Sequence, residues 1–380
     1  MSNVPLVDLG EQHRQVAAEV AAGFEEVMAS TAFVLGEQVA EFEREYAQFS
    51  GVEHCVGVAN GTDALEMILR ATGIGDGDEV ILPANSFIAT AEAVVRAGAR
   101  PVLVDSDPRY DLIDTAHVKD AISSRTRAIM PVHLYGQLAP MEELADLAEQ
   151  HNLTLLEDAA QSQGARRHGR SSGAFGAGAG TSFYPGKNLG AYGDAGAVVT
   201  SSAEIAARVR SLRNHGSERK YEHPELGFNS RMDTLQAVVL RAKLKRLADW
   251  NAQRRAAADR YAELLGDVEQ VTLPTVLPGN EHVWHLYVAR VQPAFAEEGH
   301  EATARDQVLR ALHDAGVGAG IHYPVPIHLQ GAFAHLGHRR GDFPAAEAAA
   351  DRIISLPLYP GITADQQERV AAALRAAVNA

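Results

Sequence analysis

The sequence predicts an α/β protein with a three-layer αβα large domain, built on a mostly parallel seven-stranded sheet, and a smaller C-terminal α+β domain. Three observations predict this class. The chain has 380 residues, 46% of them hydrophobic, which suits two cores rather than one. Short apolar runs alternate with helical stretches over residues 1–200. After Pro274 the pattern of strand-like and helical stretches changes, and we place the domains at 1–247 and 248–380.

The expected strands of the large domain are short apolar runs, and its expected helices lie between them. The strands are 55–59, 79–82, 101–104, 128–132, 154–157, 181–184 and 196–200, and the helices include 63–71, 87–97 and 141–150. The stretch 234–265 lacks Gly and Pro, which predicts one or two long helices that link the domains. In the small domain we expect strands at 283–291 and 317–322 and helices at 302–315 and 364–378.

Composition and charge exclude several classes of protein. The formal net charge of −15 argues against a general nucleic-acid binder, which would carry basic patches. Cys55 is the single cysteine, so no disulfide forms within the chain and a reducing compartment is expected. The N-terminus does not have the pattern of a signal peptide, and no apolar run reaches the roughly 20 residues that span a bilayer. We therefore expect a cytoplasmic protein that binds neither membranes nor nucleic acid.

The stretch 60–65, Asn-Gly-Thr-Asp-Ala-Leu, follows an expected strand and opens an expected helix. Its glycine and the free N–H groups of the new helix could hold a phosphate, although an ordinary strand–helix turn reads the same way. Two named phosphate motifs fail. Gly186-Lys187 is followed by Asn188 where a P-loop needs Ser or Thr, and the glycines at 176, 178 and 180 have the wrong spacing for a dinucleotide fingerprint.

Two further stretches carry chemistry. Asp158 ends an expected strand at the edge where open α/β sheets bind ligands, so it could pair with a cationic ligand or simply cap a helix. Lys187 lies between a strand and a glycine-rich turn, with no neighbouring acid. A desolvated lysine loses its proton readily, and its free amine can form a Schiff base, whereas a surface lysine would do neither.

Taken together, the motifs resemble those of the DegT/DnrJ/EryC1/StrS sugar aminotransferases, which have the aspartate-aminotransferase fold. The resemblance runs from about Pro5 to about Pro360 and rests on separate stretches in matching order. These are Gly-Thr-Asp-Ala-Leu at 61–65, Glu-Asp-Ala-Ala-Gln at 157–161, the loop around Lys187, Asn-Ser-Arg-Met-Asp at 229–233 and His-Tyr-Pro at 322–324.

The resemblance implies a pyridoxal 5′-phosphate (PLP) enzyme that works as a homodimer with shared active sites. It implies that Lys187 carries PLP as a Schiff base, that Asp158 pairs with the pyridine nitrogen and that Gln161 bonds the ring hydroxyl. Phe87 would stack on the ring, and the phosphate would be bound by Gly61, Thr62 and Ser182, with Asn229 reaching the phosphate of the neighbouring subunit. The substrate would be contacted by Arg231, His322 and Tyr323. Each residue also has a simpler reading: Phe87 as core, Ser182 as strand, Asn229 as a loop cap, and the last three as parts of a solvated basic loop.

The lysine loop also indicates which reaction is catalysed. Dehydratase relatives replace the lysine with histidine, so Lys187 favours transamination. The loop ends in Gly-Asp-Ala-Gly at 193–196, which resembles enzymes that aminate C3 of 3-keto sugar nucleotides, whereas C4 enzymes typically end in Gly-Glu-Gly-Gly. Ser162-Gln163 departs from the Ala-His of many C3 relatives. We expect transfer from L-glutamate to a dTDP-3-keto-6-deoxyhexose, giving a 3-amino sugar for antibiotic or surface-glycan biosynthesis.

Two alternatives remain open: a C4 aminotransferase of a dTDP-4-keto sugar, and a PLP-binding regulatory protein without turnover. No metal site is expected. His282 and His285 flank Trp284 in an expected strand, so their side chains would point to opposite faces, and His335 and His338 lie in a loop without acidic partners.

Overall fold

The computed structural model describes residues 3–219, 221–292 and 303–379. Its large sheet has seven strands in the order β1-β9-β8-β5-β4-β2-β3, which confirms the predicted sheet. Only β9 runs against its neighbours within this sheet. The strands are β1 (His54–Val58), β2 (Glu79–Pro83), β3 (Arg100–Val104), β4 (Thr126–Ile129), β5 (Thr154–Asp158), β8 (Gly178–Ser182) and β9 (Gly196–Thr200).

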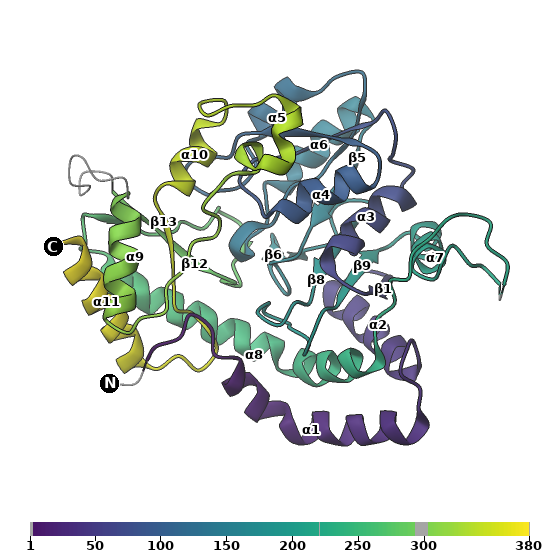
Figure 1. Ribbon diagram of the computed structural model, residues 1–380, viewed down its shortest axis with the longest axis horizontal. Coiled ribbons are helices and arrows are strands. Elements are labelled where there is room, and N and C mark those ends of the chain that lie inside the picture. Colours follow the sequence, from purple (N-terminus) through teal and green to yellow (C-terminus); the bar gives the residue numbers. More distant parts are fainter. Residues whose placement is uncertain (1–2, 220, 293–302, 380) are drawn as a thin grey trace.

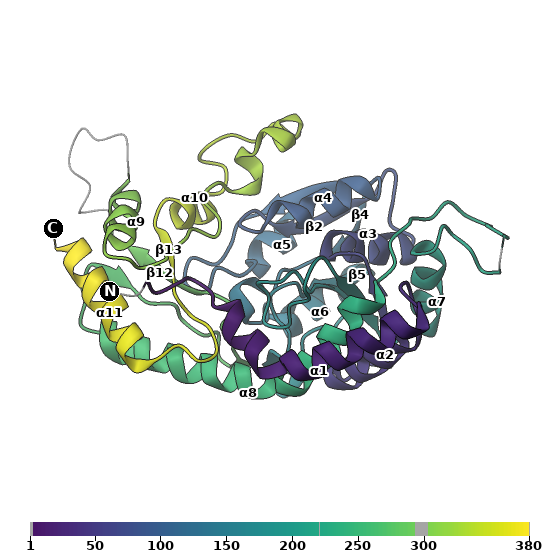
Figure 2. The same ribbon diagram turned by 60° about the horizontal axis from the view of Figure 1, so that its bottom comes forward.

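Helices cover both faces of this sheet and make the three layers visible in Figures 1 and 2. Successive strand side chains point to opposite faces, so Val56 and Val58 pack in one core while Cys55 packs in another. The first core joins α3 (Gly61–Ala71), α4 (Ile88–Arg96) and α7 (Ala203–Leu212). The opposite face is covered by α2 (Glu37–Ser50), α5 (Thr115–Ala121), α6 (Met141–His151) and the first part of α8 (Thr234–Leu265).

The helix α8 is one unbroken helix of 32 residues, as the absence of Gly and Pro predicts. It runs from the large sheet to the smaller core, with α1 (Leu9–Ser30) packed along it (Figures 1 and 2). The smaller core gathers β10 (Val271–Thr272), β12 (Tyr287–Val291), β13 (Ile353–Leu356), α9 (Ala304–Asp314) and α11 (Ala364–Val378). Val4 also packs there. The boundary at 247/248 falls inside α8 and stays a prediction.

The remaining elements are short. They are β6 (Arg166–Arg167), β7 (Arg170–Ser171), β11 (Asn280–Glu281), α10 (Pro344–Ala350) and the 3-10 turns η1 (Leu134–Gly136), η3 (Ile327–Leu329) and η4 (Gly331–Leu336). Of the described helices, none is long and apolar enough to cross a membrane.

Three predicted strands differ from the structure. The strand expected at 283–291 begins only at Tyr287, because Trp284 takes a left-handed conformation with φ of 47° and the N–H groups of Val283 and Leu286 bond to the turn η1 instead. His282 and His285 are therefore not on opposite faces of a strand. The stretch 317–322 forms single bridges to Val4 and to β13 rather than a strand.

The strand expected at 181–184 is displaced to Gly178–Ser182. Glycine is needed at two positions of this strand because no side chain fits there. A Cβ on Gly178 would lie 2.6 Å from the Val199 carbonyl oxygen, and one on Gly180 would lie 2.7 Å from the Leu65 side chain. The helix expected at 302–315 begins at Ala304; residue 302 is outside the described residues.

Phe42 provides a test of the packing between α2 and the sheet. Its ring is fully buried and lies edge-on to Phe183, with centroids 5.3 Å apart. Phe42→Ala should reduce the free energy of unfolding by about 3–5 kcal/mol, because it leaves a cavity that the core cannot refill. In urea titrations followed by tryptophan fluorescence, the control Val95→Ala, at an exposed position, should change it by less than about 0.5 kcal/mol. Equal effects of the two variants would contradict this packing.

Candidate active site

A cavity of about 800 Å³ opens at the carboxyl ends of the parallel strands. Ligands bind at this edge in open α/β sheets, because several strand–helix loops converge there. The cavity brings together nine of the eleven predicted site residues, which are Gly61, Thr62, Phe87, Asp158, Gln161, Ser182, Lys187, His322 and Tyr323. The N-terminal segment closes part of the wall with Leu6 and Val7.

Lys187 follows β8 in a tight turn in which its own N–H bonds the Tyr184 carbonyl oxygen at 2.8 Å. Its Nζ has no hydrogen bond among the described residues. Removal from water lowers the pKa of the Lys187 amine to about 8, an effect that the negative charge of Asp158 partly opposes. The side chain is therefore a cavity lysine that gives up its proton close to neutral pH, not a solvated surface lysine.

Asp158 is buried at the end of β5. One carboxylate oxygen accepts a 2.7 Å hydrogen bond from the Thr90 hydroxyl, and the other accepts one from the Ala160 N–H at 3.1 Å. Burial raises the pKa of Asp158, while these donors and the Lys187 cation oppose the rise. No helix begins after Asp158, so it is not a helix cap. Its position is that of an anion held ready for a cationic group in the cavity.

The strand before Asp158 is supported from behind by a fully buried pair. His133 Nε2 lies 2.8 Å from a Glu157 carboxylate oxygen, and both side chains are completely removed from solvent. Glu157 also accepts hydrogen bonds from three backbone N–H groups of the segment 173–176. Because all these bonds end on one side chain, the loop before β8 is held directly against β5.

The corner of the cavity where a phosphate is expected is formed by the start of α3. Asn60 caps the helix by accepting the Asp63 N–H at 2.8 Å. The N–H groups of Gly61 and Thr62 have no partner among the described residues, as expected in the first turn of a helix, where they favour an anion. A Cβ on Gly61 would lie 2.6 Å from the Ser182 Cβ, so only glycine lets β8 approach this closely.

The aromatic side of the cavity comes from two distant segments. Phe87 is half exposed, and its ring centroid lies 5.3 Å from that of Tyr323. Gln161 donates to the Tyr323 hydroxyl at 2.9 Å and accepts the Tyr135 N–H at 2.6 Å. The Tyr135 hydroxyl in turn donates to the His322 carbonyl oxygen. The segment 322–323 is therefore tied to the loop that follows β5.

Asn229 and Arg231 lie outside this cavity. Arg231 donates to the side-chain oxygens of Asn214, at 3.0 Å, and of Asn229, at 2.6 Å. Asn229 is exposed and forms an antiparallel bridge with Asn214, so it lies at the base of the loop between α7 and α8. That loop projects from the molecule beside α7 in Figures 1 and 2. The contact of Asn229 with the phosphate of a neighbouring subunit and the contact of Arg231 with the substrate stay predictions.

Several site residues were missed at the sequence level. Thr90 and His285 line the cavity, and Asn188 stands behind Lys187. Asn188 could have been noticed, since it follows Lys187 directly. No group of three or more His, Cys, Asp or Glu side chains suited to a metal ion occurs in the part of the chain that the structure describes.

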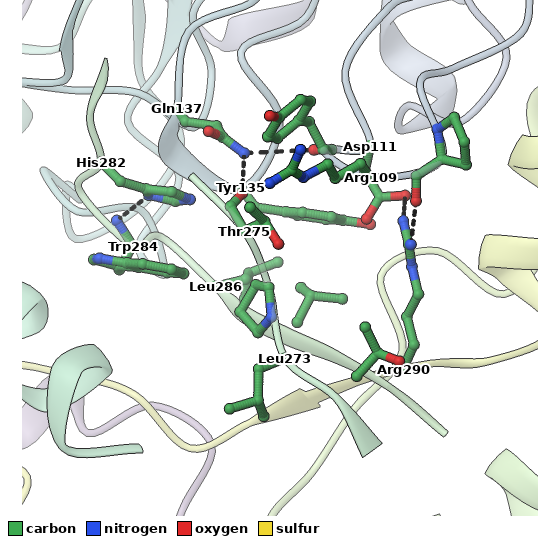
Figure 3. A pocket seen from close by; sticks show the side chains of 15 residues that line it. Arg109, Asp111, Tyr135, Gln137, Leu273, Thr275, His282, Trp284, Leu286 and Arg290 are labelled. Atoms are coloured by element: carbon green, nitrogen blue, oxygen red, sulfur yellow. Dashed lines mark hydrogen bonds and ion pairs between the residues drawn. The ribbon is translucent and has the colours of Figure 1, made fainter. Parts of the chain in front are cut away.

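A second, smaller cavity of about 200 Å³ is lined by Tyr135 and Leu286, among other residues (Figure 3). An ion pair of Asp111 with Arg290 lines one side at 2.5 Å, and His282 stacks on the Trp284 ring with centroids 3.9 Å apart. It contains neither Lys187 nor Asp158, so the pair that can do amine chemistry belongs to the larger cavity.

Comparison with known proteins agrees with this geometry. The model of the DegT/DnrJ/EryC1/StrS aminotransferase family matches residues 14–375. A pleiotropic regulatory protein of Geobacillus stearothermophilus is 44% identical over 97% of this chain and 96% of its own length. A dTDP-3-amino-3,4,6-trideoxy-α-D-glucose transaminase of Streptomyces venezuelae is 43% identical over 98% of this chain and 95% of its own length.

Solved structures are similar over the whole chain. DesV of S. venezuelae, in complex with a ketimine intermediate, has a TM-score of 0.95 at 42% identity, with all of both chains covered. NtdA of Bacillus subtilis, with bound cofactor PMP, has a TM-score of 0.91 at 30% identity and covers 100% of this chain and 86% of its own.

The pKa of Lys187 can be measured after hydroxylamine treatment, which removes any aldehyde bound to the amine. Acetylation at a range of pH values, read by mass spectrometry, should show half-maximal reactivity near pH 8. Asp158→Asn should move this pH lower, because it removes the negative charge that stabilises the ammonium form. The exposed Lys245 serves as the control in the same spectra. Two results would contradict a buried Lys187 beside the charge of Asp158. One is a pH of half-maximal reactivity for Lys187 near that of Lys245, and the other is a rise of this pH in Asp158→Asn.

Proposed function

The chain belongs to the DegT/DnrJ/EryC1/StrS aminotransferase family, and from this we propose that it uses PLP to move an amino group from L-glutamate to the C3 ketone of a nucleotide-linked sugar. One observation carries the proposal: the lowered-pKa amine of Lys187 and the buried carboxylate of Asp158 face one cavity. A reaction that needs a nucleophilic amine and an anion for a cationic ring requires this pair.

The residues present fit PLP. The unpartnered N–H groups of Gly61 and Thr62 and the hydroxyl of Ser182 would hold the phosphate. Asp158 would pair with the ring nitrogen, and the half-exposed face of Phe87 offers an apolar surface for the ring. Among the described residues, the Gln161 side chain bonds only to Tyr135 and Tyr323, which leaves one amide hydrogen for the ring hydroxyl.

When bound, PLP supplies an electron-withdrawing ring that stabilises the carbanion formed on loss of the α-proton. Lys187 would be its attachment point and then the proton carrier. With a pKa of about 8, the amine is partly unprotonated near neutral pH, so it can accept the proton and later return it. Asp158, fixed by Thr90 and Ala160, would hold the positive charge of the ring nitrogen throughout.

We further propose the substrates and the assembly. The Gly-Asp-Ala-Gly ending at 193–196 and the C3 transaminase among the relatives favour a dTDP-3-keto-6-deoxyhexose, for deoxyaminosugar biosynthesis in the cytoplasm. His322 and Tyr323, which line the cavity, would contact the sugar. Arg231, whose guanidinium group is held by Asn214 and Asn229, would contact the nucleotide sugar. Asn229 and its exposed loop would reach the phosphate site of a second copy in a homodimer.

A second candidate is a PLP-binding regulator without turnover, because one relative is named a pleiotropic regulatory protein. The complete set of Lys187, Asp158 and Gln161 in one cavity favours the enzyme, since a binding protein needs no amine of lowered pKa. The two readings differ in their response to L-glutamate, which only the enzyme converts to its keto acid.

Lys187→Met should lower the release of keto acid from L-glutamate at least about 100-fold, because it removes the group that moves the proton. Circular dichroism should show an unchanged fold. Lys245→Met, which removes an exposed lysine, is the matched control and should keep full activity. Full activity in Lys187→Met would refute the assignment of the lysine, and a wild-type protein that releases no keto acid would favour the regulator.

Regiochemistry is tested by turnover against a panel of 3-keto and 4-keto sugar nucleotides, run in reverse with the amino sugars where a ketone is unstable. We expect kcat/KM for the 3-substituted compounds to exceed that for the 4-substituted compounds by at least about 100-fold, which corresponds to nearly 3 kcal/mol of transition-state binding. Product from the 4-keto compounds alone would overturn the C3 assignment.

A further inference from the structure

Asn188, the residue that follows Lys187, is buried and uses its whole amide group. Its Nδ2 donates to the Asn251 Oδ1 and to the Val283 carbonyl oxygen, both at 2.9 Å. A carbonyl oxygen can only accept, so the atom that faces Val283 must be the NH₂ group. The orientation of the amide is therefore fixed, and the Oδ1 of Asn188 faces His285.

This orientation fixes the tautomer of His285. Its Nδ1 lies 3.2 Å from the Asn188 Oδ1, which only accepts, so Nδ1 must carry a proton. Burial and the nearby cationic groups, Lys187 first, hold the pKa of His285 well below its usual value, so the ring is neutral. The Nε2 is then left with a bare lone pair. His322 is different, because its Nδ1 faces the Ser355 hydroxyl, which can donate or accept.

The lone pair of His285 needs a donor. The side chain lines the same cavity as Lys187, and its Nε2 has no hydrogen bond within residues 3–219, 221–292 and 303–379. An acceptor on a cavity wall is satisfied by a ligand that can donate. Of the two proposed substrates, L-glutamate brings carboxylates, which only accept, and an amino group that is consumed in the reaction. A sugar brings hydroxyl groups, which donate.

We propose that His285 is a specificity-determining residue whose Nε2 accepts a hydrogen bond from a hydroxyl of the sugar substrate, with Asn188 as the positioning residue that fixes its tautomer. The proposal rests on the proposed function and names a contact within it.

The hydrogen bonds that hold Asn188 continue into the core. The Asn251 Nδ2 donates to the Gln163 carbonyl oxygen at 2.9 Å, and the Gln163 Nε2 donates to the Ser182 carbonyl oxygen at 2.8 Å. This chain of amides joins the lysine turn, α8 and the end of β8. Gln163, which stands where many C3 relatives have His, therefore has a structural role. It links Ser182, at the expected phosphate site, through Asn251 to Asn188, the residue that orients His285.

Two substitutions separate the two ring nitrogens. The amide of His285→Asn reaches only the Nδ1 position, so it keeps the contact with Asn188 and removes the acceptor from the cavity. The longer side chain of His285→Gln can place its carbonyl oxygen near the Nε2 position. His335→Asn, at an exposed position in η4 outside the cavity, is the control. Each half-reaction is followed separately by stopped-flow absorbance of the bound cofactor, with L-glutamate or with the most active 3-amino sugar nucleotide from the panel.

We expect His285→Asn to lower the rate constant over Kd of the sugar half-reaction about tenfold more than that of the glutamate half-reaction, the size of one hydrogen bond. His285→Gln should recover most of this loss. Equal slowing of both half-reactions, or no recovery by Gln, would overturn the proposal.

The tautomer is tested without turnover. The ¹⁵N chemical shifts of the His285 ring, assigned by their loss in His285→Gln, should show a protonated Nδ1 and a bare Nε2 in the wild-type holoenzyme. A protonated Nε2 would overturn the proposal. If neither substrate reacts with the wild type, the proposed function fails, and the ¹⁵N shifts still decide whether Asn188 sets the tautomer.

Discussion

The site depends on keeping two opposite charges out of water in one cavity. Burial alone pushes the Lys187 amine toward its neutral form and the Asp158 carboxyl toward its neutral form, while their mutual attraction pushes both back toward charge. The balance leaves a lysine that titrates near pH 8 and a carboxylate stabilised by the Thr90 hydroxyl and the Ala160 N–H. A deeper cavity without these donors would favour two neutral groups, and a solvated one would favour two ordinary ions. Neither arrangement offers both a nucleophile and a fixed anion.

The fold maintains this balance through close approach and buried hydrogen bonds. The parallel strands bring Asp158 and Lys187 to one edge, but the contact between β8 and α3 requires Gly61, where any side chain would meet Ser182. Behind the strands, the pair of His133 and Glu157 ties the loop before β8 to β5. Such polar groups are costly to bury unless fully bonded, so they specify one arrangement of the site rather than adding generally to stability.

The sequence predicted the parts of the fold that depend on local pattern. Continuous apolar runs gave most of the parallel strands, and the absence of Gly and Pro predicted α8 as a single or paired helix. It misplaced β8, because Gly178 and Gly180 read as loop residues although tertiary crowding demands glycine there. Nine of the predicted site residues meet in one cavity because each belongs to a contiguous motif. Thr90 and His285 were missed, since their importance comes only from what folding places beside them.

The stretch 282–285, His-Val-Trp-His, shows where such reasoning from sequence ends. His282 is buried and His285 is partly buried, and removal from water lowers the pKa of each, so both rings are neutral. Yet His282 Nδ1 accepts the Trp284 N–H, which puts the ring proton on Nε2, whereas His285 Nδ1 donates to Asn188, which leaves Nε2 bare. One ring therefore offers a donor to the cavity of Figure 3, and the other offers an acceptor to the cavity of Lys187. Residue type and charge are the same in both cases, and only the partner of Nδ1 decides what each histidine can bind.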